Sequence, residues 1–308
     1  MKDFIGKSIR WGIRWAKGDG RDWDDRRMVL NARTLMSSDA WRCPHESSFG
    51  GFAGKEFSVY SQFGDDGIIQ YLLWRLQIHS GSFIEFGVGD YYESNTHFLL
   101  VNNNWRGFVM DGSDANMSKV RSSPIYWKYD LTAKEAFVDR DNVSELLAAS
   151  GFDSVQLLHI DLDGNDYWIL DVLALSELDP DILILEYNAH FGDSRAIAVP
   201  YRQDFDRLIA HYSGQYFGAS LPALDSLARK KGYYFVGCNM AGNNAYFLAN
   251  RHLGTFPEVS LLSGFVPAKF RDCRDEEGRL TFLSHIEARG LIKGMPVVNV
   301  DTGLPEVF

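Results

Sequence analysis

Residues 83–90 read Phe-Ile-Glu-Phe-Gly-Val-Gly-Asp, and this stretch decides the fold of the chain. Its first four residues are mostly aromatic or β-branched, which is typical of a strand in the middle of a sheet. Gly87 and Gly89 allow the backbone to turn tightly and a ligand to approach it closely. The sequence then predicts a helix over Thr96–Val101, with Ser94 as its N-cap. A strand, a glycine turn and a helix in this order are typical of a nucleotide-binding corner in an α/β fold.

The glycine turn differs from the two common phosphate-binding motifs. The dinucleotide-binding fingerprint requires a third glycine where this chain has Tyr92, and no Gly-Lys-Ser/Thr follows as in a P-loop. Glu85 and Asp90 flank the turn, and their negative charges would repel a pyrophosphate. The same carboxylates suit a ligand with an amino group and a ribose, such as S-adenosylmethionine, which also carries a sulfonium cation. The alternative is an ordinary strand-to-helix turn that binds no ligand.

Composition limits the classes of function that the chain can have. With 308 residues, of which 45% are hydrophobic and 23% charged, it has the balance of a soluble globular protein with an ample core. The formal net charge of −10 argues against a nucleic-acid partner, which requires a basic footprint. Three widely spaced cysteines without a CxxC pair predict neither a disulfide framework nor a zinc site, and favour the cytoplasm. No apolar run reaches about 18 residues, so no membrane span is expected.

Residues 1–57 are interpreted as an N-terminal extension that carries a basic amphipathic helix at residues 2–17. Ile5, Ile9 and Ile13 recur every four residues, and lysines and arginines line the opposite face. Such a helix predicts contact with an anionic membrane surface or a protein partner. The alternatives are packing on its own domain or on a second subunit of a homo-oligomer.

Further strands are predicted along the chain, and most of them end in polar residues. Two of these strands are nearly continuously apolar, as expected in a parallel sheet that is covered on both faces. The expected strands are 83–86, 105–110, 125–129, 155–160, 182–185, 233–237 and 245–249. The last two are expected to form a hairpin. The sequence therefore predicts an α/β fold with a Rossmann-like, doubly wound, mostly parallel seven-stranded sheet that ends in an antiparallel hairpin.

The order of these elements resembles the class I S-adenosylmethionine-dependent methyltransferases, and within them the FkbM-type branch. The resemblance rests on Ser61–Gly67, Ile84–Gly89, Asp111 and Ile160–Gly164, and it spans about residues 58–250. It implies a methyltransferase domain over 58–250, followed by a covering extension over 251–308. The chain departs from the family in having Tyr91 at the position of a frequent third glycine. It also has Asp163 where the FkbM-type branch commonly has glutamate.

The resemblance also implies a set of cofactor contacts. Glu85, Gly87 and Gly89 are expected under the methionine part of S-adenosylmethionine. An acid at the end of the second strand, Asp111, is expected to hold the ribose diol, and Asp130 is expected near the adenine. The remaining candidate contacts are Gln62, Asn95 and Gly112.

Polar residues that follow the strands at 155–160 and 182–185 are expected to converge at one edge of the sheet. A hydroxyl acceptor must lose a proton during methyl transfer, so a general base or a metal ion is required. His190 or Asp161 is the candidate base, with Asp163 as a further catalytic candidate. Alternatively, Asp161, Glu186 and Asn188 hold Mg²⁺, which prefers oxygen ligands. The competing interpretations are a helix cap for Asp163 and a buried, hydrogen-bonded side chain for His190.

These observations predict methyl transfer to a hydroxyl of a sugar or a related small molecule, in polysaccharide or natural-product biosynthesis. Two alternatives stay open at this point. One is an N-methyltransferase on the same fold. The other is a noncatalytic module that has kept the cofactor fold and docks on a partner through residues 2–17.

Overall fold

A computed structural model of the chain describes residues 23–43 and 52–308. The first part holds a helix over residues 23–36 and the short helix α2, Asp39–Arg42. The side chain of Ser38 caps α2 by accepting a hydrogen bond from the Trp41 amide. The basic amphipathic helix predicted at residues 2–17 lies outside the described residues. The fold below concerns residues 52–308.

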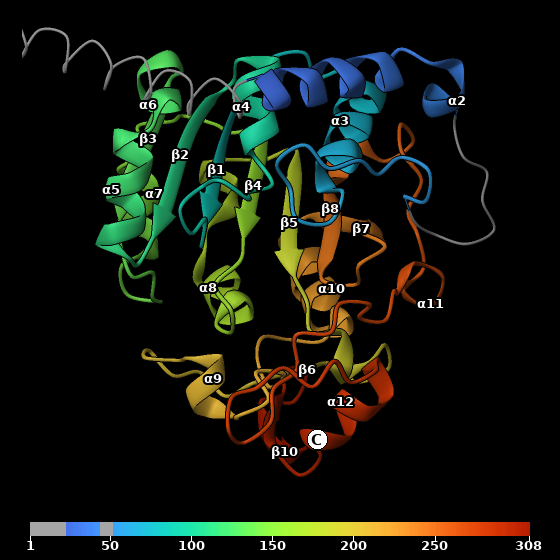
Figure 1. The fold of residues 1–308 in the computed structure, drawn as a ribbon. Helices are drawn as coiled ribbons and strands as arrows, with labels where there is room; N and C mark the ends of the chain where they lie inside the picture. The colour runs from blue at the N-terminus through green and yellow to red at the C-terminus, as the bar shows by residue number, and fades with distance from the viewer. Residues whose placement is uncertain (1–22, 44–51) are drawn as a thin grey trace, which may run out of the picture. The chain divides into compact units, whose positions relative to one another are not determined.

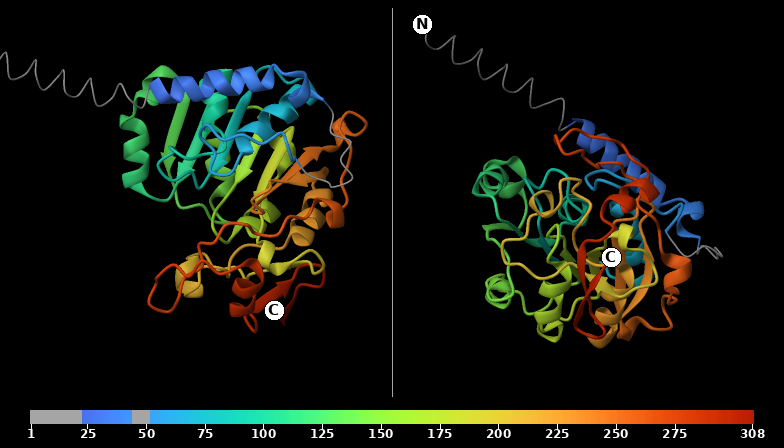
Figure 2. Two further views of the ribbon diagram at one scale, coloured as in Figure 1. Left: turned by 45° about the vertical axis from the view of Figure 1, so that its right-hand side comes forward. Right: turned by 90° about the horizontal axis from the view of Figure 1, so that it is seen from below.

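A seven-stranded sheet forms the centre of this part, and its strands run side by side in Figures 1 and 2. The order across the sheet is β3-β2-β1-β4-β5-β8-β7, and within this sheet of the described residues β8 is antiparallel to its two neighbours. The strands are β1 (Ser82–Phe86), β2 (Arg106–Asp111), β3 (Leu131–Glu135), β4 (Leu157–Ile160), β5 (Ile182–Glu186), β7 (Tyr233–Cys238) and β8 (Asn244–Ala249). The predicted fold class is confirmed: the sheet is Rossmann-like, mostly parallel, and ends in an antiparallel hairpin.

The strand order reverses between β1 and β4. From β1 the chain adds β2 and β3 on one side of β1, and it then crosses to the other side to add β4 and β5. Ligands of open α/β sheets bind at such a switch point, beside the carboxyl ends of the strands. Residues 83–90 occupy this position, since β1 ends at Phe86 and the glycine turn follows directly. The stretch that decides the fold therefore also lies where a ligand is expected.

Helices cover both faces of the sheet. One face carries Ile84, Phe108, Leu158, Leu183 and Phe247, which form a buried apolar cluster with residues of α7, α8 and α10. The opposite face carries Glu85, His159 and Tyr246, which meet α3 and the segment that leads into α4. The helices are α3 (Asp65–Leu76), α4 (His97–Asn103), α5 (Asp114–Ser122), α6 (Pro124–Lys128), α7 (Val143–Ala148), α8 (Asp166–Val172) and α10 (Leu221–Lys230).

The strand predicted at 125–129 is wrong. Residues Pro124–Lys128 form α6, and the third strand is β3, which begins at Leu131. Pro124 is the first residue of α6, a position where its missing N–H is no loss. Because β3 is an edge strand with several exposed residues, its sequence lacks the apolar run that identifies the other strands.

The N-cap predicted at Ser94 is also wrong. Helix α4 begins at His97, and Ser94 instead donates a hydrogen bond to the Glu85 carboxylate. Helix α3 has Gly64 as its N-cap residue, with no side-chain cap. The Asp66 carboxylate accepts from the amides of 59–61, and Asp65 binds side chains of the β8 region. The residues near both helix starts therefore make tertiary contacts in place of local caps.

A second, smaller sheet lies beyond the carboxyl ends of the parallel strands, together with α9 and α12 (Figures 1 and 2). It has the antiparallel order β10-β9-β6, so residues 251–308 pair with a segment inserted before α10. Its own apolar cluster includes Phe191, Ile197 and Val297. The elements are η2 (Ala189–Phe191), β6 (Ile197–Ala198), α9 (Arg207–Ala210), α12 (His285–Leu291), β9 (Pro296–Asn299) and β10 (Leu304–Val307). Helix α11 (Leu261–Gly264) instead packs against β7 of the main sheet. The division of the chain at residues 57 and 250 stays a prediction.

Within the described residues, no helix has the length and apolar character needed to cross a membrane.

Candidate active site

A line of neighbouring residues crosses the carboxyl edge of the sheet, and we call it the edge row. Asp111 is the register partner of Glu135, and Glu186 is the register partner of Asn244. Gly87 and Asp161 lie between these pairs, since each comes directly after the last paired residue of β1 or β4. From β3 to β8 the edge row is Glu135, Asp111, Gly87, Asp161, Glu186 and Asn244. Parallel pairing thus aligns acids that the sequence separates by many residues.

The glycine turn follows β1 in left-handed backbone conformations. Gly87, Gly89 and Tyr91 have φ angles of 73°, 55° and 61°. A Cβ atom on Gly87 would lie 1.7 Å from the carbonyl oxygen of Asp161, so only glycine fits where the turn crosses the end of β4. Tyr91 accepts the unfavourable conformation because its ring stacks on His97 and its hydroxyl contacts Thr96 at 3.1 Å. The turn therefore keeps its shape without the third glycine that its family resemblance calls for.

The carboxylate of Glu85 lies beneath the turn and is saturated by protein donors. Its oxygens accept hydrogen bonds from the Ser94 hydroxyl at 2.6 Å, the Asn95 amide at 3.1 Å, and the amide and hydroxyl of Thr96. A fifth donor is Nδ1 of His159 at 2.9 Å. Glu85 lines one of the cavities described below, but its carboxylate oxygens are occupied by these protein donors and are not available to a ligand. Its observed role is to fix the segment 94–96 against the end of β1.

His159 is a residue of this site that the sequence pattern does not reveal, because it falls within an apolar strand. It is buried on β4 beside Glu85, and its Nε2 lies 3.4 Å from the side-chain nitrogen of Asn95. Burial alone lowers the pKa of His159, but the hydrogen bond and the negative charge of Glu85 outweigh it and raise the pKa. For Glu85, burial raises the pKa, and the contact with His159 reverses this and lowers it. The two groups therefore form a buried ion pair. The pair can be recognised only once β1 and β4 are known to be neighbours in the sheet.

Asp111 ends β2 beside the glycine turn. Its Oδ2 accepts a hydrogen bond from the Gly89 amide at 2.9 Å, and its Oδ1 accepts from the Ser113 amide at 2.9 Å and from Asn116 at 3.2 Å. These contacts orient the carboxylate. Oδ1 accepts two hydrogen bonds and Oδ2 accepts one, so a lone pair remains on Oδ2 for a further donor. Asp111 is partly exposed, as a ligand contact requires.

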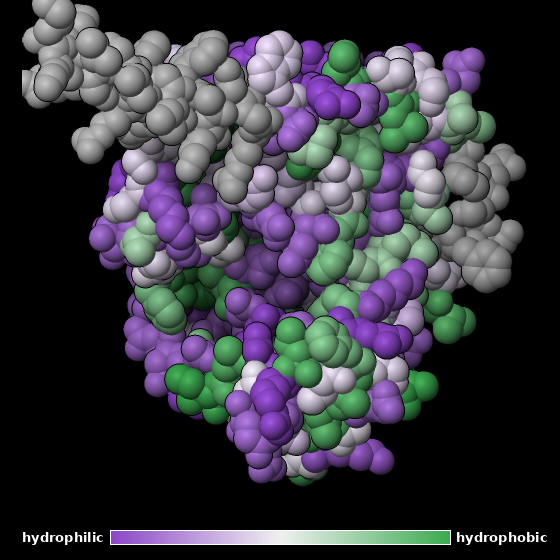
Figure 3. Space-filling model, viewed as in Figure 1, coloured by the Kyte–Doolittle hydropathy of each residue, from purple (hydrophilic) through white to green (hydrophobic). Residues whose placement is uncertain are grey.

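Two cavities meet at Gly87 and Asp161, which line both of them. The first cavity lies over Asp111 and Gly112 and is also lined by Phe137, Val138 and Phe205. The second cavity lies over Gln62, Glu85, Gly89 and Asn95 and is mainly polar, with Asp65, Asn243 and Asn244 on its far side. Figure 3 shows the recess between the main sheet and the C-terminal elements, with hydrophilic residues over its middle.

Asp130 does not belong to this site. It precedes β3, accepts a hydrogen bond from Nε of Arg106 at 2.8 Å, and its backbone pairs with Gly107 at the start of β2. It therefore lies at the amino edge of the parallel strands, opposite the cavities. After β3, it is Phe137 that lines the first cavity. This residue is 57% exposed, and its ring lies against Gly112. The error follows from the misplaced third strand, which put Asp130 at a strand's end and not at its beginning.

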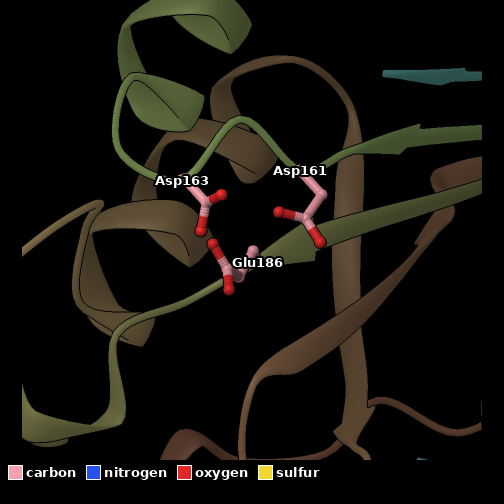
Figure 4. A group of neighbouring side chains, drawn as sticks. All are labelled: Asp161, Asp163 and Glu186. Atoms are coloured by element: carbon pink, nitrogen blue, oxygen red, sulfur yellow. The ribbon is translucent and has the colours of Figure 1, made fainter. Parts of the chain in front are cut away.

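Three carboxylates converge beside the point where the cavities meet, and we call them the carboxylate triad: Asp161, Asp163 and Glu186. One oxygen from each lies within 4.8 Å of the others. Figure 4 shows the three groups turned toward one another from the ends of β4 and β5 and from the loop after β4. Glu186 is buried, and its Oε2 has no hydrogen-bond partner among the described residues. Such an arrangement calls for a proton or a cation.

Burial and mutual repulsion shift the titration of the carboxylate triad. Burial, followed by the charge of Asp163, raises the pKa of Asp161 to about 7. Burial, followed by the charge of Asp161, raises the pKa of Glu186 well above its usual value. Arg207 of α9 offsets part of this charge: its guanidinium lies 3.1 Å from Asp163 and 3.6 Å from Asp272. A carboxylate with a pKa near 7 has the proton affinity that a general base needs at neutral pH.

Two predicted site residues have other roles. The side chain of Asn188 donates to the carbonyls of Gln215 and Phe217, both at 2.9 Å, and accepts from the amide of His190 at 2.9 Å. These contacts fix the turn after β5. The predicted metal ligands were Asp161, Glu186 and Asn188, whereas in the structure the residue that joins Asp161 and Glu186 is Asp163.

His190 lies away from both cavities, with its ring stacked on His285 at 4.7 Å between centroids. Burial, together with the neighbouring His285, lowers the pKa of His190 to about 4, which makes it a weak base at neutral pH. The prediction of His190 as the base is therefore wrong in position, and Asp161 is the candidate that remains.

No family model matches the chain, and no curated protein matches it. Solved structures that resemble it include a TehB-like S-adenosylmethionine-dependent methyltransferase from Corynebacterium glutamicum, with a TM-score of 0.35 and 9% identity over 61% of this chain and 89% of that one. Fibrillarin from Aeropyrum pernix, solved with natively bound S-adenosylmethionine, has a TM-score of 0.38 and 6% identity over 55% of this chain and 67% of that one. A methyltransferase from Geobacter sulfurreducens in complex with S-adenosylhomocysteine has a TM-score of 0.32 and 14% identity over 55% and 64%. At these values the likeness concerns the fold alone.

Proposed function

We propose that the protein is an S-adenosylmethionine-dependent methyltransferase. The observation that carries the proposal is the sheet order with its antiparallel β8, combined with a glycine turn and Asp111 at adjacent strand ends beside two joined cavities. This arrangement is what the resemblance of the sequence to class I methyltransferases implies, and the motifs at 61–67 and 160–164 favour the FkbM-type branch.

The residues present fit the cofactor. Gly87 leaves its backbone open at the junction of the cavities, where any Cβ would clash with Asp161. In the first cavity the Asp111 carboxylate would accept a hydrogen bond from a ribose hydroxyl, and the exposed ring of Phe137 would stack on the adenine. In the second cavity Asn95 and the acid-rich wall would face the amino-acid part. When bound, the cofactor supplies an electrophilic methyl group on a sulfonium, so the protein mainly has to align the acceptor.

Isothermal titration calorimetry with S-adenosylhomocysteine tests the proposal. We expect saturable binding with one site per chain and a micromolar Kd, and an increase of the melting temperature in parallel. A Gly87→Val variant is expected to lose this heat signal, because a branched side chain cannot fit beside Asp161. If the wild-type protein releases no heat and shows no melting shift with the compound, the chain is not a methyltransferase of this class.

The acceptor group is proposed to be a hydroxyl of a sugar or a related small molecule. Asp161 lines both cavities, so it lies where a proton must leave the acceptor as the methyl group arrives. Its pKa of about 7 suits proton removal from a hydroxyl that is aligned for transfer. A nitrogen acceptor that is neutral when it attacks would not need this base, so the position and pKa of Asp161 favour O-methylation over N-methylation.

As the alternative way of activating the hydroxyl, the carboxylate triad is proposed to hold Mg²⁺, with Asp161, Asp163 and Glu186 as ligands in place of a free base. The unpartnered Oε2 of Glu186 and the convergence of three carboxylates fit a hard divalent cation, which would lower the pKa of a bound hydroxyl. Arg207 already contacts Asp163, and a bound cation would weaken that ion pair.

Metal binding is expected to stabilise the protein measurably. At Mg²⁺ or Mn²⁺ concentrations near 100 times the Kd, the gain is about 2.7 kcal/mol, or roughly 5–10 °C in melting temperature for a domain of this size. Glu186→Gln should abolish the shift, whereas Glu177→Gln, which makes the same charge change on an exposed 3-10 helix, should keep it. Equal shifts in the two variants would assign the metal effect to another part of the protein.

The cytoplasm is the proposed location. Cys238 and Cys273 are buried thiols that form no disulfide within the described part of the chain. This state is expected in a reducing compartment.

A further inference from the structure

Asn244 is the most unusual polar residue of the second cavity. It is 3% exposed, and its side-chain oxygen has no hydrogen-bond donor among the described residues. Its side-chain nitrogen donates to Oδ1 of Asp65 at 3.1 Å. Oδ1 of Asp65 also accepts from Asn239 and from the Tyr246 hydroxyl, so it is an acceptor for Asn244 too, and this contact assigns the two ends of the Asn244 amide. The free group of Asn244 is therefore an acceptor that lacks a donor.

The position of Asn244 connects it with the carboxylate triad. It is the register partner of Glu186 across β5 and β8, so the two side chains leave the same face of the sheet as neighbours. The Oε2 atom of Glu186 likewise lacks a donor among the residues that the structure describes. Two adjacent buried acceptors without donors cost free energy unless a ligand satisfies them.

The charge of the second cavity points in the same direction. Asp65, Glu85, Glu93 and Asp161 line it, whereas the lining residues that the structure describes include no lysine or arginine. The basic residue in this described lining, His159, is paired with Glu85. On the Asn244 side of the cavity, next to Asp65 and Asp161, an anionic acceptor group would be repelled, whereas the cofactor's carboxylate is assigned to the Asn95 side.

We propose that Asn244 is a specificity residue for the methyl acceptor, and that the acceptor is an uncharged polyol or an amine-bearing sugar. A hydroxyl or amino group of the acceptor donates to the Asn244 oxygen beside Glu186. The acidic side chains of the cavity disfavour sugars that bear phosphate or carboxylate. This inference rests on the proposed function, because it assigns the second cavity's far side to the acceptor.

The test measures probe binding to protein saturated with S-adenosylhomocysteine, by saturation-transfer NMR. The probes are methyl hexosides and hexosamines, with the matching hexuronates and hexose 6-phosphates. We expect saturation transfer to the first two classes and none to the last two. Asn244→Ala should weaken probe binding by about tenfold, the value of one lost hydrogen bond.

Tyr246→Phe is the matched control, because its hydroxyl also donates to Asp65 but it does not line the cavity. It should keep probe affinity, and both variants should keep the affinity for S-adenosylhomocysteine. An equal loss in the two variants would assign the effect to the support of Asp65 and overturn the inference. Preferred binding of the anionic probes, or no binding of the uncharged and amino probes, would also overturn it. Each of these results would leave the proposed function intact as long as S-adenosylhomocysteine binds. If that compound did not bind, the proposed function itself would fail.

Discussion

Replacing Asp161 by asparagine is expected to lower the rate of methyl transfer by about 100-fold to 10,000-fold, the usual contribution of a general base. The carboxylate lies at the junction of the two cavities, and burial beside Asp163 raises its pKa to about 7. Asparagine keeps the shape of the side chain and removes its basicity. The rate is measured by transfer of a radioactive methyl group to the uncharged hexoside and hexosamine probes, and the Kd of S-adenosylhomocysteine should stay within about threefold of the wild-type value.

The pH dependence follows from the same pKa. Only the ionised form of Asp161 removes a proton, so kcat of the wild-type protein should rise as the pH increases through about 7 and then level off. The variant should lack this rise. A rate for Asp161→Asn near that of the wild-type protein would remove Asp161 from the mechanism.

Asp163→Asn separates the two proposed ways of activating the hydroxyl. Asp163 is exposed and paired with Arg207, so without a metal ion its replacement should act on proton transfer only by lowering the pKa of Asp161, which the charge of Asp163 raises. If a bound metal ion is required, Asp163→Asn should lose most of the activity and partly regain it at high Mg²⁺. If Asp161 acts without metal, Asp163→Asn should keep its rate within a few-fold, and chelators should not change it.

Replacing Asp111 by alanine is expected to weaken the binding of S-adenosylhomocysteine by about 100-fold, or about 3 kcal/mol. The carboxylate is oriented by the amides of Gly89 and Ser113 and by the side chain of Asn116, which leaves a lone pair on Oδ2 for a ribose hydroxyl. Hydrogen bonds to a charged acceptor are each worth about 1.5–3 kcal/mol. Calorimetry measures the change directly, without a methyl acceptor.

Two variants control for indirect effects of the Asp111 substitution. Asp130→Ala removes the same side chain at the opposite edge of the sheet, where it makes an exposed ion pair with Arg106, and should leave the Kd unchanged. Asn116→Ala removes one protein partner of Asp111 and should change the Kd less than tenfold. If Asp111→Ala binds as tightly as Asp130→Ala, the ribose is held elsewhere.

Local sequence patterns were enough to predict most of the central sheet, the glycine turn and the acids at strand ends. These features are local: apolar runs build buried strands, glycines permit the turn, and polar residues mark where a strand leaves the core. For this reason local patterns alone are enough to single out Glu85, Gly87, Asp111, Asp161 and Glu186. The edge strand β3 has no such run, so its start cannot be located from the pattern, and Asp130 is assigned to the wrong edge of the sheet.

Which polar groups are free and which have protein partners depends on the three-dimensional arrangement of the strands. Glu85 and His159 are 74 residues apart, and their ion pair forms because β1 and β4 are neighbours in the sheet. Asn188 was expected to bind metal, yet carbonyls nearly 30 residues away occupy its amide. Asn244 acquires its unpartnered oxygen through Asp65, 179 residues earlier. Hydrogen-bond partners at such separations follow from strand order and register, which local patterns do not encode.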